Sequence, residues 1–172
     1  MRSIAAMDIV VHSMLIAEAF DGLLAVGWLD DLVGKSARFA KTVGEFDVYQ
    51  FAGVSGDFYA AHVNEAAMKN TSLGRRVAHG ALLVAYMSAA STRLIEAVNG
   101  AGQALPVSLG YDRVRFTAPV FLGDTVTVDY RVTDYDASTQ RSTADVEVRN
   151  QRGEIVAVAA HLMKWLASES PS

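Results

Sequence analysis

The pattern of hydrophobic and polar positions changes from helical to alternating along the chain. Residues 77–100 contain an almost unbroken apolar run, and a helix that is apolar on nearly all sides is enclosed by other structure. Asn99 and Gly100 supply a stop signal for this helix, which would be about 30 Å long at 1.5 Å per residue. The apolar run is too short to cross a bilayer, so the pattern favours a buried core helix over a membrane span.

The second half of the chain has the period of β-strands. Apolar and polar residues alternate in residues 125–132 and 143–149, residues 155–165 end the series, and turn signals separate these runs. An earlier strand near residues 36–43 and a short helix at residues 45–54 are also predicted. Short connections imply antiparallel pairing. The sequence therefore predicts an α+β fold, in which an antiparallel β-sheet wraps around one long central helix.

Composition limits the class of protein. The chain has 172 residues, 51% of them hydrophobic and 20% charged, which suits one domain with a real core. The net charge of −4 comes from interspersed acids and bases, so no nucleic-acid partner is expected. The chain has no cysteine, which excludes disulfides, thiolate metal sites and a cysteine nucleophile.

Three regions follow from these patterns. Residues 1–33 are rich in apolar residues and predict an amphipathic helix or a poorly ordered extension. Acidic residues interrupt this region, so neither a membrane anchor nor an export signal is expected: Asp8, Glu18 and Asp21. Residues 34–166 form the predicted domain, and residues 167–172 a disordered tail. We expect a cytoplasmic protein without a membrane partner.

Candidate chemistry lies in residues 55–62, where Asp57 and His62 are five residues apart. On a helix the two side chains would be separated by about 140° around the axis, and on a strand they would point to opposite faces. They can converge only where the backbone bends, which Gly56 allows. At this spacing alone, a capping aspartate and a surface histidine are the commoner interpretation.

The surrounding motifs are more specific. Residues 51–62, 74–83 and 116–125 resemble, in this order, three segments of the MaoC-like dehydratases of the (R)-specific enoyl-CoA hydratase (hydratase 2) type. In that family a Ser-Gly-Asp-Phe-Asn-Pro-x-His segment leads to an Ala/Val-His-Gly-x-Leu helix start. The similarity covers about residues 34–165. It implies a hot-dog fold and a lyase that adds water to a 2-enoyl thioester or removes it from an (R)-3-hydroxyacyl thioester.

The resemblance also implies roles for residues. Asp57 and His62 match the family's catalytic pair, which holds and activates one water. Gly80 matches the position whose backbone N–H binds the thioester carbonyl, and Ser88 matches a helix serine that supports the pair. For Ser88, a core serine bonded to the preceding turn is an equally good interpretation. The acyl carrier, coenzyme A or acyl-carrier protein, is part of the substrate, so no separate cofactor is expected.

The chain departs from the family pattern at Tyr59 and Ala60, which replace Asn-Pro. Tyr59 either lines the acyl pocket and narrows substrate choice or packs outward. Arg75 and Arg76, just before the helix, are either a solvated loop pair or contacts to coenzyme A phosphates.

No catalytic or metal-binding role is expected for the remaining histidines. His79 adjoins Gly80, and we expect it to serve in packing and hydrogen bonding. His12 and His161 are interpreted as ordinary residues. No pair of histidines has ligand spacing with a carboxylate, so the sequence implies no metal.

Two other functions remain open. A hot-dog thioesterase usually places an acid on the central helix, whereas this helix has none before Glu96. A non-catalytic acyl-thioester binder is the other alternative, kept open by the altered turn at Tyr59. The exposed sheet edge of one hot-dog unit further predicts a homodimer, with the acyl site near the subunit boundary.

Overall fold

A five-stranded antiparallel sheet is the frame of the protein in this computed structural model, which describes residues 29, 31–99 and 104–167. The strand order across the sheet is β1-β3-β4-β5-β2. The strands are β1 (Ser36–Thr42), β2 (Ala104–Phe116), β3 (Thr125–Asp136), β4 (Arg141–Asn150) and β5 (Ile155–Ala167). The pairs β3–β4 and β4–β5 are consecutive in the chain, as the short predicted turns required.

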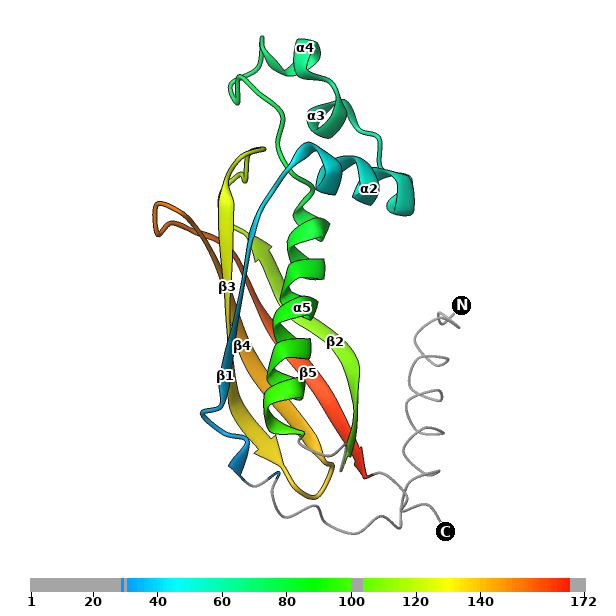
Figure 1. Ribbon diagram of the computed structural model, residues 1–172, viewed down its shortest axis with the longest axis vertical. Coiled ribbons are helices and arrows are strands. Elements are labelled where there is room, and N and C mark those ends of the chain that lie inside the picture. The colour runs from blue at the N-terminus through cyan, green and yellow to red at the C-terminus, as the bar shows by residue number, and fades with distance from the viewer. Residues whose placement is uncertain (1–28, 30, 100–103, 168–172) are drawn as a thin grey trace, which may run out of the picture.

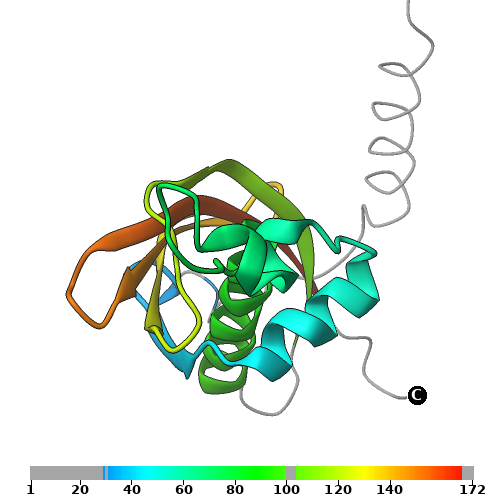
Figure 2. The ribbon, with the colours of Figure 1, turned by 90° about the horizontal axis from the view of Figure 1, so that it is seen from above.

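Four helices complete the described part of the chain: α2 (Glu45–Ser55), α3 (Ala60–Val63), α4 (Glu65–Met68) and α5 (Gly80–Val98). The sheet curves around α5, as the view along the helix shows (Figure 2). The three shorter helices lie together at the end of the sheet where α5 begins (Figure 1). This end of the fold carries the predicted site.

The core lies between α5 and the sheet, and the alternating pattern explains it. Val126, Val128, Tyr130 and Val132 of β3 are at most 1% exposed, as their shared face predicts. On α5 the buried side chains face the sheet: Leu82, Leu83, Tyr86, Met87, Ala90, Ser91 and Leu94. Burying one large apolar side chain stabilises the fold by about 1.5–3 kcal/mol, so this interface fixes α5 firmly in place.

The length of the apolar run was a wrong reason to exclude a membrane span. At 19 residues, α5 is long and apolar enough to cross a membrane by length and composition, so its length does not exclude a span. Its packing is what assigns it to a core, because it contacts strands β1, β3 and β4. The predicted helix end is confirmed at Asn99, the C-cap residue of α5, whose N–H donates to the Ile95 carbonyl; Gly100 lies outside the described residues.

Two features went unpredicted. Strand β2 has no clear alternation because two register shifts interrupt its pairing with β5, and Arg113 there has a positive φ of 52°. The core also extends into the segment assigned to the N-terminal extension, since Leu29 and Leu32 are 0% and 1% exposed. Residues 1–28 and 30 of that extension, with His12, lie outside the described residues, as do residues 168–172 of the tail.

Candidate active site

Ser55, Gly56 and Asp57 form the bend that must bring Asp57 and His62 together. Helix α2 ends because Gly56 is left-handed, with φ 79°, and its N–H donates to the Ala52 carbonyl. The Ser55 hydroxyl accepts from the Asp57 N–H at 3.2 Å. The Asp57 carboxylate in turn accepts from the Tyr59 N–H at 3.2 Å, which is an Asx-type turn. These local bonds turn the chain back toward α5.

His62 lies on the single turn of α3 that follows this bend. Its Nδ1 is 2.8 Å from the Val77 carbonyl oxygen, and the Val77 N–H donates to the Ala61 carbonyl at 3.0 Å. A carbonyl only accepts, so Nδ1 is the donor, and in the neutral ring Nε2 keeps its lone pair. The ring is thereby held in one tautomer, with Nε2 available as a base.

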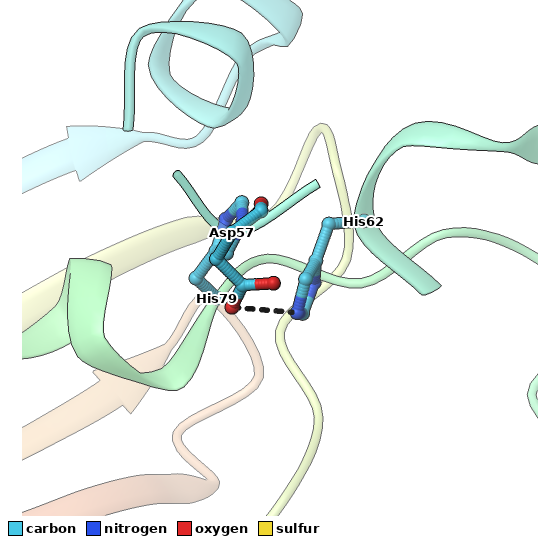
Figure 3. A group of neighbouring side chains, drawn as sticks. All are labelled: Asp57, His62 and His79. Atoms are coloured by element: carbon cyan, nitrogen blue, oxygen red, sulfur yellow. Dashed lines mark hydrogen bonds and ion pairs between the residues drawn. The ribbon is translucent and has the colours of Figure 1, made fainter. Parts of the chain in front are cut away.

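The fold brings Asp57 and His62 together as the sequence required. The Asp57 Oδ2 atom is 3.9 Å from His62 Nε2, and the two side chains are 51% and 14% exposed (Figure 3). This separation is too long for a direct hydrogen bond but suits a water that bonds to both groups. The pair therefore has the geometry of a water-binding site open to solvent.

His79 lies against both members of this pair. Its ring is 2% exposed and stacks on the His62 ring, with centroids 3.8 Å apart and planes 27° apart. Its Nε2 is 2.9 Å from the Asp57 carbonyl oxygen, and its Nδ1 has no hydrogen-bond partner among the described residues. The expected role in packing and hydrogen bonding is confirmed, but its contacts are with the candidate catalytic residues themselves.

Asp57, His62 and His79 are near enough to one another to be considered as metal ligands, which their spacing in the sequence did not indicate. Ligand atoms of Asp57, His62 and His79 all lie within 4.8 Å of one another. However, the Nε2 of His79 already donates to the Asp57 carbonyl oxygen, and its Nδ1 is buried, so this ring offers an ion no exposed ligand atom. The arrangement therefore suits a water held by one carboxylate and one imidazole better than a shared ion.

Gly80, the first residue of α5, follows His79 directly. Its N–H has no acceptor within the described part of the chain, as is usual for the first turn of a helix. A pocket of about 340 Å³ is lined by Gly80, Leu83 and Phe116, among others. An unpaired N–H at the start of a partly buried helix is suited to bind a carbonyl oxygen that gains negative charge.

Comparison with known proteins assigns this arrangement to a family. A family model described as "MaoC like domain" matches residues 33–154 of the chain.

The chain belongs to the MaoC-like family.

Named relatives agree with this assignment. The chain is similar to the "(R)-specific enoyl-CoA hydratase" of Rhodospirillum rubrum, with 42% identity over 114 residues, 66% of this chain and 74% of the relative. The solved (R)-hydratase from A. caviae, described as involved in PHA biosynthesis, superposes with a TM-score of 0.67 at 30% identity, covering 77% of this chain and 95% of that one. The R-hydratase PhaJ1 from Pseudomonas aeruginosa gives 0.66 at 31% identity, over 81% and 88%. The fold is the hot-dog fold that the sequence predicted.

The two arginines of this MaoC-like chain have different environments. Arg76 forms ion pairs with Glu45 and Glu65, the latter at 3.1 Å, and its side chain is only 11% exposed. The hydrogen bonds that Arg76 donates to the Glu45 carboxylate lower the pKa of Glu45 and raise the pKa of Arg76. Arg75 is exposed and lies over the Phe121 ring at 3.9 Å. Arg76 therefore links α2 to α4, and of these two arginines only Arg75 remains available for a phosphate.

Two further residues singled out by the MaoC-like motifs lie apart from the pair. Ser88 is exposed, about 12 Å along α5 from Gly80 at 1.5 Å per residue, and among the described residues its side chain makes no hydrogen bond to Asp57 or His62. Tyr59 is 68% exposed, and its ring meets the His62 ring edge-on at a centroid distance of 6.1 Å. The structure therefore gives Ser88 no supporting contact with the pair and places Tyr59 outward beside it.

Sequence reasoning missed the contacts of His79 and of Phe116 in the MaoC-like site. His79 is 22 residues from Asp57, so no local spacing connects the two. An alanine Cβ at Gly80 would lie 2.6 Å from the Phe116 ring. The glycine itself was the available signal, because a glycine at the first position of a buried helix indicates close approach of another group.

Proposed function

We propose that this chain is an (R)-specific enoyl-CoA hydratase, a hydro-lyase that adds water to 2-enoyl thioesters and removes it from (R)-3-hydroxyacyl thioesters. The observation that carries the proposal is the facing pair of Asp57 and His62, 3.9 Å apart, together with a Gly80 N–H that has no acceptor in the described part of the chain. The similarity to enzymes named (R)-specific enoyl-CoA hydratase supports it.

The geometry suggests a division of labour. Water bound between Asp57 and His62 attacks Cβ of the enoyl group, and its proton passes to the unprotonated Nε2 of His62. The electrons move to the thioester oxygen, where the Gly80 N–H stabilises the enolate. Delivery of one proton from the pair to Cα completes the addition, so the protons balance.

A thioesterase is the main alternative, and α5 disfavours it. Its acid, Glu96, is exposed and lies near the end of the helix opposite to Gly80. Thioesterase action releases a free thiol, whereas hydration removes the conjugated double bond and leaves the thioester intact.

The test is incubation of the pure protein with short, medium and branched enoyl-CoA esters. We expect loss of the conjugated thioester absorbance, no thiol release and an (R)-3-hydroxyacyl product. Release of a free thiol together with loss of the thioester absorbance would support the thioesterase. Neither change, with a ligand still bound, would support the non-catalytic binder.

The proposed assembly is a homodimer in the cytoplasm, with the acyl site near the subunit boundary. Strand β2 is an open edge of the described sheet and carries exposed apolar residues: Leu105, Val107 and Leu109. Such an edge is a liability that pairing with a second copy removes. A monomeric mass at micromolar concentration in analytical ultracentrifugation would contradict the dimer.

A further inference from the structure

The turn that carries Asp57 is held by few bonds. Within this turn, the Ser55 hydroxyl, the Asp57 carboxylate and the Gly56 backbone bond only to residues two to four positions away. Asp57 itself is exposed, so packing does little to fix it. The Asn-Pro pair that would stiffen this turn is absent, because Tyr59 and Ala60 stand there.

One long-range hydrogen bond ties this turn to the body of the protein. The His79 Nε2 atom lies 2.9 Å from the Asp57 carbonyl oxygen, across 22 residues of sequence. Because the carbonyl can only accept, Nε2 carries the proton and donates it. No other hydrogen bond from Gly56, Asp57 or Phe58 reaches beyond neighbouring residues in the described chain.

His79 is itself rigidly placed. It is the N-cap residue of α5, with extended backbone angles, and one peptide bond separates it from Gly80. Its ring is buried between the Phe51 ring, at a centroid distance of 4.9 Å, and the His62 ring, at 3.8 Å. A single side chain therefore connects the carboxylate turn, the catalytic imidazole and the helix start that binds the carbonyl.

We propose that His79 is a positioning residue of the hydratase site: its Nε2–H anchors the Asp57 turn, and its ring fixes the plane of His62. This inference rests on the proposed function. It explains how an exposed aspartate keeps the 3.9 Å separation from His62 that a shared water requires. His79 does not touch the reacting atoms, so its effect passes through the pair.

Two substitutions separate the roles of the ring and the donor. His79→Phe keeps a flat ring against His62 but removes the N–H, whereas His79→Gln keeps an N–H at a similar reach. For His79→Phe we expect kcat to fall about 10- to 100-fold with KM changed less than about threefold, since misplacement of a catalytic group by about 1 Å has effects of this size. His79→Gln should recover part of kcat. In an Asp57→Asn background, His79→Phe should cost little more, because residues that act as a unit are non-additive.

A second readout does not depend on activity. Amide hydrogen exchange of residues 55–60 should become faster in His79→Phe, because local opening of the turn no longer breaks the anchoring bond. The matched control is His161→Phe, which removes another buried histidine, 1% exposed, with its bonds to Ser108 and Tyr130. It should leave both kcat and exchange at the turn unchanged.

The outcomes separate this inference from the proposed function. Inactive wild-type protein with faster exchange in His79→Phe would reject the hydratase but retain the anchor. Normal kcat and unchanged exchange in a folded His79→Phe variant would overturn the anchor. Exchange of residues 55–60 as fast in His79→Gln as in His79→Phe would also overturn the anchor, because the donor that glutamine restores would then have no separate effect on the turn.

Discussion

Replacement of Gly80 by alanine tests whether close approach at the start of α5 shapes the site. An alanine Cβ would lie 2.6, 2.7 and 2.9 Å from three atoms of the Phe116 ring. Carbon atoms in ordinary contact are about 3.5–4.0 Å apart, so the ring must retreat by about 1 Å. Phe116 is 51% exposed, and its ring has room to turn outward.

The expected effect is large on activity and small on stability. Overpacking at the rim costs about 1 kcal/mol, at the low end of its usual range, and alanine in a helix regains up to about 1 kcal/mol over glycine. The displaced Phe116 ring, however, changes the pocket of about 340 Å³ that it lines with Gly80. We expect Gly80→Ala to lower kcat/KM for enoyl-CoA about 10- to 100-fold, with Tm nearly unchanged.

Two companion variants make the result specific. Phe116→Ala in the Gly80→Ala background should recover activity relative to the single variant, because it removes the clash. Gly53→Ala, in α2, is the control: nothing lies within 4 Å of its Cβ position, so activity should stay normal. Full activity of Gly80→Ala would refute the steric reasoning, as would a double variant no better than Gly80→Ala.

Three further predictions concern residues around the fold. Burial lowers the pKa of His161 to about 4, below its value of about 6.5 in the unfolded chain, so the neutral ring is favoured by folding. Its neutral state therefore contributes of the order of 3 kcal/mol to the free energy of unfolding, fully above about pH 6.5 and less toward pH 4. The stability of His161→Gln should depend less on pH in this window. An unchanged slope of unfolding free energy against pH would contradict the assignment. Arg75→Ala should raise KM for coenzyme A substrates in a salt-dependent way, whereas Arg76→Ala should lower the free energy of unfolding by about 1 kcal/mol. A raised KM in Arg76→Ala with a lowered stability in Arg75→Ala, measured by kinetics and thermal melts, would contradict these roles. Tyr59→Asn should shift kcat/KM between short, medium and branched esters by about tens of fold in ratio if the ring borders the acyl group, and a uniform change would show that Tyr59 only holds the turn.

The elements that follow a simple period could be predicted from the sequence. The apolar positions of β3, such as Val126 and Val128, alternate and are buried, and the apolar run of residues 77–100 contains α5. Strand β2 could not be predicted in this way, because its register shifts and the positive φ of Arg113 interrupt the period. A pattern of alternation predicts a strand only where the strand is regular.

The candidate site could be predicted only in part. Asp57 and His62 lie within one bend that Gly56 makes possible, so local reasoning with the motif resemblance was sufficient to pair them. The contacts of His79 depend on how α5 packs under the turn, and that is set by tertiary structure. The position of Ser88 apart from the pair likewise follows from its place on α5, which a motif match does not specify.

The most direct test of the central claim is the rate of crotonyl-CoA hydration by the wild-type chain, Asp57→Asn, His62→Ala and the double variant. We expect hydration to an (R)-3-hydroxyacyl product by the wild type and loss of nearly all activity in each folded single variant. The double variant should be little worse than either one, because both groups act on the same water. Full turnover by a folded Asp57→Asn or His62→Ala variant would contradict the account.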